Sequence, residues 1–167
     1  LRKSTEDGEP NVSQTLNHAA MLVNLGRPTE AIEAVDGVRG MSVYGQLVQA
    51  SVRYGAALQL ADEALAARSL EFIQTHRGEG PRILLFNLLR GGDLDGAAAL
   101  LIELLGSEAD RTEALAFAQD YLRGPELPHA GPIRANRDVL LARPDIRAAI
   151  DEVGRTESHP IFRLRFP

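Results

Sequence analysis

Four histidines, His18, His76, His129 and His159, are the side chains of this sequence best suited to binding a metal or transferring a proton. No two of them are spaced to share one face of a helix, and the chain contains no cysteine. A zinc site would therefore need carboxylates from distant positions in addition to these histidines. We expect no metal site and no cofactor, and we interpret His18 as a helix residue that packs or forms hydrogen bonds.

Acidic and glycine-rich segments form no recognisable catalytic or ion-binding motif either. Asp93-Leu94-Asp95-Gly96 begins like a calcium loop but lacks the later acidic ligands and the closing glutamate, so helix capping explains it better. Gly37-Val38-Arg39-Gly40 lacks the lysine and hydroxyl of a phosphate-binding loop, and the chain has no Gly-x-Ser-x-Gly elbow. We therefore predict that the chain is not an enzyme.

The composition excludes other classes of protein. The 167 residues carry a net charge of −5, with 25% charged and 44% hydrophobic residues. These values argue against a disordered chain and against nucleic-acid binding through bulk charge. No apolar run approaches the roughly 20 residues that cross a bilayer, so we expect a soluble protein without membrane insertion.

The use of basic residues bears on the source of the chain. Lys3 is the only lysine, whereas arginine and alanine are abundant, which is typical of a bacterial genome rich in G and C. Helix propensity favours the same two residues, so an all-helical chain explains the bias equally well. The sequence begins at Leu1 rather than methionine, which leaves the compartment open between bacterial cytoplasm and periplasm.

Three alanines spaced 33 residues apart, Ala31, Ala64 and Ala97, lie in similar sequence windows. A period of this length combined with helical periodicity is typical of stacked helical hairpins, each too small to bury its apolar face alone. The sequence therefore predicts an all-α chain with three helical hairpins in residues 11–106. Residues 1–10 are expected to be a flexible lead-in or linker.

Capping and breaking residues predict six helices in this region. Each expected helix starts at a capping residue or a proline and stops at a turn. The expected starts are Asn11, Pro28, Ser42, Asp62, Pro81 and Asp93.

The sequence gives the weakest evidence for the turn between the third and fourth helices. Residues 44–77 contain no proline, so they could form one helix of about 30 residues, well above the usual mean of about 11 or 12. The 33-residue register instead predicts a break at Gln59–Ala61. The middle unit departs from its neighbours, because Gln59 replaces the turn glycine and Arg68 stands where an apolar residue is expected.

Residues 107–167 are expected to pack as a cap on the last hairpin, in one continuous domain with the repeats. A seventh helix should run from Ser107 or Asp110 to Arg123, followed by an extended connection over residues 124–133. Two short helices are expected at Arg134–Ala142 and Pro144–Val153. The alternating apolar residues 162, 164 and 166 predict either a strand-like arm or an extended end.

Residues 11–106 resemble tetratricopeptide repeats. The resemblance is carried by Leu25-Gly26-Arg27-Pro28-Thr29-Glu30-Ala31-Ile32 and by Gly92-Asp93-Leu94-Asp95-Gly96-Ala97, which match the family's turn and the opening of its second helix. The middle unit keeps only Asp62-Glu63-Ala64-Leu65. The resemblance implies a right-handed superhelical array of about three helix-turn-helix hairpins, with a concave groove formed by the first helix of each.

Members of this family commonly bind peptides or extended protein segments in that groove. By position, the resemblance implies that one set of polar, aromatic and basic side chains faces the partner. The set is Asn17, Asn24, Gln49, Arg53, Arg82, Phe86 and Arg90. Because a row of arginines pairs well with carboxylates, the most specific ligand that we expect is an acidic or C-terminal peptide. Arginines on a helix face often only improve solubility, which is the alternative interpretation.

Two functions of different class follow. The first is a non-catalytic protein-protein interaction scaffold that binds a peptide, a partner helix or a second copy of the chain. The alternative is a helical accessory or regulatory domain of a larger enzyme or signalling protein, with the catalytic part outside this chain.

Overall fold

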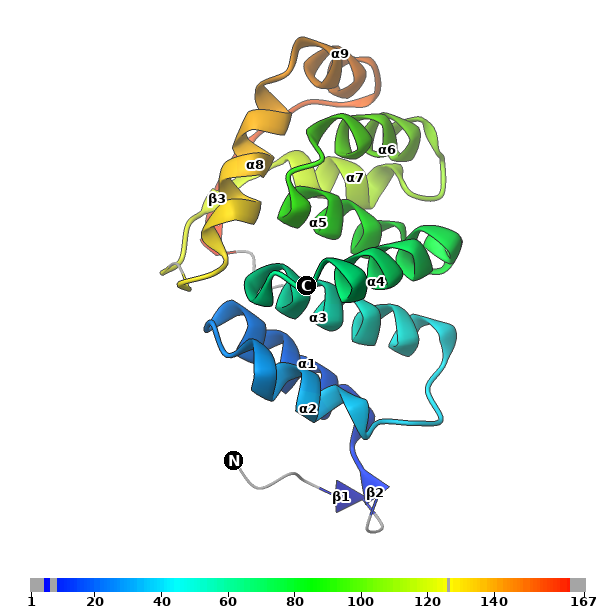
Figure 1. Cartoon of the computed structure of the whole chain (residues 1–167). Coiled ribbons are helices and arrows are strands. Elements are labelled where there is room, and N and C mark those ends of the chain that lie inside the picture. Colours follow the sequence, from blue (N-terminus) through cyan, green and yellow to red (C-terminus); the bar gives the residue numbers. More distant parts are fainter. Residues whose placement is uncertain (1–4, 7–8, 126, 163–167) are drawn as a thin grey trace. The chain divides into compact units, whose positions relative to one another are not determined.

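The computed structural model describes residues 5–6, 9–125 and 127–162, which form nine α-helices and four short strands (Figure 1). The predicted all-α class is therefore confirmed. No helix in the described ranges has the length and apolar character needed to span a bilayer. The chain divides into two compact units, an N-terminal unit of residues up to 87 with Leu127–Ala130 and a C-terminal unit of residues 88–125 and 131–162. The expected limits 11–106 and 107–167 stay a prediction.

The N-terminal unit contains four complete helices and the start of a fifth. They are α1 (Val12–Asn24), α2 (Pro28–Asp36), α3 (Val43–Leu60), α4 (Glu63–Thr75) and α5 (Pro81–Gly91), with a 3-10 turn, η1, at Arg77–Glu79 before α5. Two short strands, β1 (Thr5–Glu6) and β2 (Glu9–Pro10), pair antiparallel ahead of α1. The predicted caps are confirmed, because Asn11 accepts the N–H of Gln14 and Ser42 accepts the N–H of Gly45.

The core of this unit is built where α1, α2 and α3 meet. Side chains one helical turn apart on each helix are removed from water, which is the main favourable contribution to folding. The central buried residues are Leu16, Ala19, Leu22, Val23, Ala31, Val35, Val52 and Ala56.

Three helix ends share one turn geometry. Each has a residue in the left-handed region, Gly26 (φ 74°), Ala61 (φ 55°) or Gly92 (φ 79°). The next residue donates its N–H to a carbonyl of the last helical turn, as in the Schellman motif. These bonds are Arg27 to Leu22 (2.9 Å), Asp62 to Ala57 (3.0 Å) and Asp93 to Leu88 (2.9 Å). The predicted break is therefore present, but it begins at Ala61 and not at Gln59, because α3 continues through Leu60.

The three turns are not evenly spaced. The residues preceding α2, α4 and α6, namely Arg27, Asp62 and Asp93, are 35 and then 31 residues apart. Ala31 and Ala97 are fully buried, whereas Ala64 is exposed. The equivalence of Ala64 with the other two alanines was therefore wrong. Helix α4 begins two residues late relative to the 33-residue register, which also leaves Arg68 in solvent and buries Ser69 and Ile73.

The C-terminal unit packs three helices around α6 (Leu94–Gly106). These are α7 (Arg111–Ala118), α8 (Gly131–Ala142) and α9 (Pro144–Val153), and Ile146 and Ile150 of α9 are buried. Strand β3 (Asp120–Leu122) pairs in parallel with β4 (Ser158–Phe162). The predicted strand-like arm began at residue 162, where β4 ends, and residues 163–167 lie outside the described residues.

The predicted seventh helix ends too late. Helix α7 stops at Ala118, not Arg123, because Gln119 joins the chain to the segment before β4. Its Nε2 donates to Arg155 O (3.0 Å) and its Oε1 accepts the N–H of Glu157 (2.7 Å). The expected extended connection is also shorter than predicted, since α8 already begins at Gly131.

Substitution of the three alanines by glutamate tests this register. Ala31→Glu and Ala97→Glu each force a charge into a fully buried position and should lower the free energy of unfolding by about 3 kcal/mol or more. Ala64→Glu, at an exposed position of α4, should change it by less than about 0.5 kcal/mol. Thermal melting followed by circular dichroism measures the effect. Equal destabilisation by all three variants would contradict the unequal spacing.

Candidate functional site

The residues predicted to line a groove differ in exposure and belong to two different units. Asn17 is exposed on α1, Asn24 is half-buried at the end of α1, and Gln49 is buried on α3. The basic and aromatic members of the set are all half-buried. Arg53 lies on α3, Arg82 and Phe86 lie on the part of α5 in the N-terminal unit, and Arg90 belongs to the C-terminal unit.

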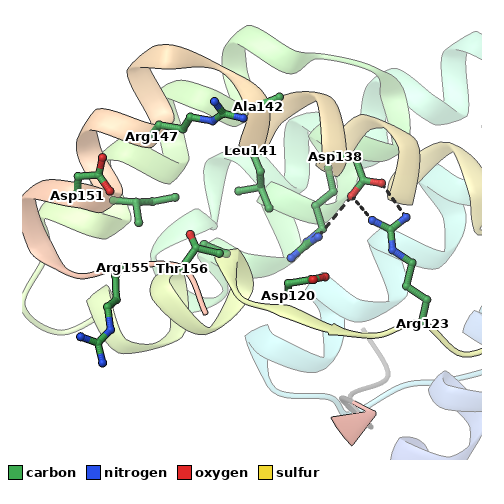
Figure 2. Close-up of a pocket in the computed structure, with 12 residues that line it drawn as sticks. Asp120, Arg123, Asp138, Leu141, Ala142, Arg147, Asp151, Arg155 and Thr156 are labelled. Atoms are coloured by element: carbon green, nitrogen blue, oxygen red, sulfur yellow. Dashed lines mark hydrogen bonds and ion pairs between the residues drawn. The ribbon is translucent and has the colours of Figure 1, made fainter. Parts of the chain in front are cut away.

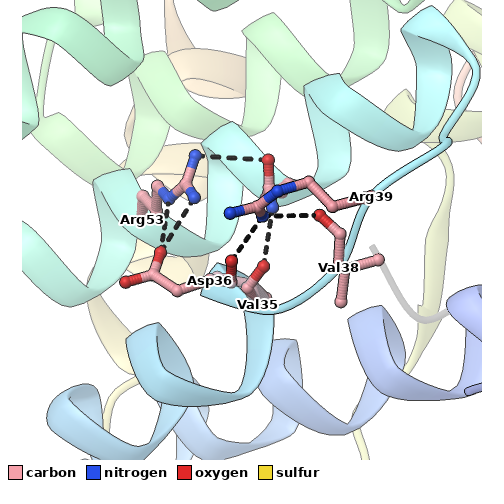
Figure 3. Close-up of polar contacts among 6 residues, drawn as sticks. Val35, Asp36, Val38, Arg39 and Arg53 are labelled. Carbon is pink, nitrogen blue, oxygen red and sulfur yellow. Dashed lines mark hydrogen bonds and ion pairs between the residues drawn. The ribbon is translucent and has the colours of Figure 1, made fainter.

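Arg53 and Gln49 are bound to the C-terminal end of α2 (Figure 3). The guanidinium of Arg53 donates to one oxygen of Asp36 from Nη2 (2.8 Å) and from Nε (3.2 Å), and to Oε1 of Gln49 (3.2 Å). Gln49 in turn donates to the carbonyl of Val35 (2.7 Å), and Arg39 donates to that of Val38 (3.0 Å). Gln49 thus adds a donor to a carbonyl in the last turn of α2, Arg39 also contacts the carbonyl of Asp36 at the end of that helix, and Arg53 holds the Asp36 side chain. Arg53 and Gln49 therefore have a structural role that the sequence did not predict.

The buried side-chain amide of Asn87 on α5 was not identified from the sequence. Asn87 is fully buried and donates from Nδ2 to Ser51 Oγ (2.9 Å) and to the carbonyl of Ile83 (2.7 Å). Its Oδ1 accepts the hydroxyl of Ser51 (3.2 Å), so α3 and α5 are joined by a reciprocal pair. The available signal was a polar residue inside the apolar run from Leu84 to Leu89.

The C-terminal unit contains an open cavity of about 690 Å³ beside α8 and α9 (Figure 2). Its lining mixes arginines and aspartates with a few apolar side chains. The residues are Ala118, Asp120, Arg123, Arg137, Asp138, Leu141, Ala142, Arg147, Ile150, Asp151, Arg155 and Thr156.

Most of the cavity's cations are already engaged with protein groups. Arg123 forms an ion pair with Asp138 (2.9 Å), the contact at the right of Figure 2. Arg137 donates to the carbonyls of Phe117 (2.7 Å) and Gln119 (2.8 Å), and its guanidinium lies 5.2 Å from the Phe117 ring. These contacts join α8 to the end of α7. The cavity is therefore primarily a junction between elements of the C-terminal unit.

The chemistry available in this cavity is limited. Its lining includes neither histidine nor a nucleophile held by a base, and no group of three histidines or carboxylates within the described ranges could hold a metal ion. Among the described residues, the side chain of Arg147 on α9 has neither a hydrogen-bond nor an ion-pair partner. The cavity thus offers charge for binding but no arrangement for acid-base catalysis.

Two ion pairs near helix starts shift the pKa of a carboxyl group. Arg143 donates to Asp145 (2.9 Å) and also contacts Asp95 (2.6 Å), which joins the starts of α9 and α6. The hydrogen bond from Arg143 lowers the pKa of Asp145, and the hydrogen bond from Arg27 likewise lowers the pKa of Glu30. Asp93 accepts the N–H of Gly96 (2.8 Å), so the interpretation of the Asp93–Gly96 segment as a helix cap is confirmed.

Large apolar side chains are exposed where α1 and α3 end in the N-terminal unit. Gln59 donates from Nε2 to the carbonyl of Val23 (2.8 Å), so the two helix ends lie together. Leu25, which follows α1, is 41% exposed, and Leu58 and Leu60 on either side of Gln59 are 42% and 46% exposed. Neither leucine of α3 nor Leu25 was among the predicted partner-binding residues. We call Leu25, Leu58 and Leu60 the leucine cluster.

Comparison with protein-family models, curated proteins and solved structures finds no significant match to this sequence. The resemblance to tetratricopeptide repeats accordingly stays a prediction from the sequence.

Reversal of Arg53 should destabilise the protein. Arg53→Glu places a carboxylate against Asp36 and removes the donor to Gln49, and it should lower the free energy of unfolding by about 1–2 kcal/mol. The control is Arg68→Glu, an exposed position on α4. Urea unfolding measures both. Equal stability of the two variants would show that Arg53 is not an anchor.

The lowered pKa of Asp145 predicts a specific pH dependence. Because the folded pKa lies below the ordinary value of 3.8, the bond to Arg143 stabilises the fold fully above that value and is lost as the pH falls through the folded pKa. The melting temperature of Arg143→Gln should therefore be below wild type at pH 6, with the difference shrinking below pH 3.8. The control Arg147→Gln should show no such pH-dependent difference. A difference that is constant from about pH 6 to about pH 2.5 would contradict the assignment.

Proposed function

We propose that this chain is a non-catalytic interaction module that binds a segment of a partner protein at the leucine cluster. Exposed apolar groups gathered at one place are typical of protein-protein interaction sites, whereas isolated ones are ordinary. The carrying observation is that Leu25, Leu58 and Leu60 are each more than 40% exposed at two helix ends joined by Gln59, with Leu58 and Leu60 on different sides of α3.

The recurring turns support a helical repeat of the tetratricopeptide type within this proposal. Each of the three helix ends has a left-handed residue at the same position of the turn and the same main-chain hydrogen bond. Intervals of 35 and 31 residues bracket the 34-residue period of that family. The proposed array is therefore an irregular one, with its second hairpin displaced in sequence.

The chemistry of the proposed partner segment is apolar rather than acidic. An acidic peptide would reach the guanidinium of Arg53 only in competition with Asp36, which already neutralises that charge at 2.8 Å. A leucine-rich surface instead gains free energy by burying apolar area, at about 25 cal/mol per Å². Leucine, isoleucine or aromatic side chains on the partner would supply that area.

Affinity capture with the full chain from a lysate of its source organism tests this function. A partner should be enriched on the wild-type chain and lost on the double variant Leu58→Asp/Leu60→Asp, because two charges would be desolvated on binding. The matched control is Val43→Asp/Tyr44→Asp at the opposite end of α3, where the side chains are 38% and 56% exposed. That control should retain the partner.

Two results would contradict the proposal. One is that no protein is enriched on the wild-type chain. The other is that both double variants, with unchanged helicity, lose the partner equally.

A further inference from the structure

We infer that the C-terminal end of α1 is a docking site for a peptide turn in which proline is followed by a residue with a planar ring. In this chain the site is filled by residues Leu127–Ala130, whose sequence is Leu-Pro-His-Ala. The inference rests on the proposed function, because it names the class of segment bound beside the leucine cluster.

The carbonyl groups at the end of α1 identify the site. A helix leaves its last four carbonyls without a partner inside the helix. Those of Met21, Leu22 and Val23 accept N–H groups from the turn itself, namely those of Leu25, Arg27 and Gly26. The last one, Asn24, accepts the N–H of His129 at 3.0 Å. The final acceptor of α1 is thus satisfied by the main chain of a segment more than 100 residues later.

Gly26 makes room for the ring of this segment. A Cβ atom at residue 26 would lie 2.5 Å from Nε2 and 2.6 Å from Cδ2 of His129, so only glycine allows the imidazole to come so close. At the equivalent turn in the C-terminal unit, a Cβ on Gly92 would find its nearest neighbour, Asn136 Nδ2, at 3.9 Å. The close ring contact is therefore specific to the end of α1 and does not come from the turn geometry.

The bound segment is suited to exchange with an external one. Residues 127–130 form a turn closed by the N–H of Ala130 on the carbonyl of Leu127 (3.1 Å), and Pro128 has a fixed φ within that turn, which lowers the entropy lost on binding. Its specific contacts are one main-chain hydrogen bond and one ring packed on a glycine, and Leu25 next to Gly26 stays 41% exposed. A partner segment with the same Pro-ring pattern and an added apolar residue would make these contacts and cover Leu25 as well.

The probe is a fluorescently labelled peptide with the sequence of residues 123–134, added to the full-length chain. In the wild type the internal segment competes at a high effective concentration, so binding should be weak. His129→Pro removes the donated N–H and the ring, which empties the site. The labelled peptide should then bind at least about 10-fold more tightly to His129→Pro than to wild type, as measured by fluorescence anisotropy.

Glycine variants in the His129→Pro background supply the matched control. Gly26→Ala introduced into the His129→Pro chain should abolish peptide binding, whereas Gly40→Ala introduced into the same chain should not. Both glycines have positive φ, 74° and 70°, so both alanines are strained, but a Cβ on Gly40 meets nothing within 4 Å. As a check that does not require Gly26→Ala to fold, a peptide with proline in place of its histidine should fail to bind the His129→Pro chain.

The inference is overturned if the peptide binds neither wild type nor His129→Pro, or if it binds with equal affinity when its histidine is replaced by proline. Either result leaves the proposed function standing, provided that partner capture still depends on Leu58 and Leu60. Conversely, the peptide can bind as expected while capture is insensitive to those leucines, in which case the proposed function fails and the docking site is retained.

Discussion

The carbonyl groups at helix C-termini are the constraint on which the rest of this structure depends. Each helix of a short-helix protein leaves four carbonyls that must find donors, and burying one without a partner costs about 1–3 kcal/mol. Here the three left-handed turns supply part of the donors. Side chains outside each helix donate further hydrogen bonds to carbonyls at these ends: Gln59 at α1, Gln49 and Arg39 at α2, Asn136 at α5, Arg111 at α6 and Arg137 at α7. The same side chains fix where each helix stops and what it packs against.

This constraint also explains why polar residues suited to ligand binding are not available for it. Arg53 and Gln49 lie on α3 with the amide and guanidinium groups that peptide recognition uses, yet both are bound at the end of α2. Arg137 lines the charged cavity of the C-terminal unit and is bound to two carbonyls around α7. The proposed function instead uses apolar area at the ends of α1 and α3. One carbonyl there, that of Asn24, is satisfied by a turn from a distant part of the sequence.

Much of the secondary structure follows from local sequence, and the departures have identifiable causes. Asn11, Ser42, Asp93 and the prolines at helix starts act through neighbours within four residues, so their roles could be predicted. Ala61 adopts a left-handed conformation that its residue type does not favour, and only the repeat register indicated a turn there. The end of α7 was mispredicted because Gln119 bonds to residues 36 and 38 positions away. The partner of Arg53 was missed for the same reason, since Asp36 belongs to another helix.

Hydrogen exchange at the amide of His129, followed by nuclear magnetic resonance on the full chain, tests most directly whether the end of α1 holds the turn at Leu127–Ala130. The account predicts clear protection of this amide relative to other non-helical positions such as Gly40, because its N–H is donated to the carbonyl of Asn24 at 3.0 Å. Exchange at the rate of an unstructured peptide would contradict it, since the last carbonyl of α1 would then be satisfied by solvent and the segment would not be bound there.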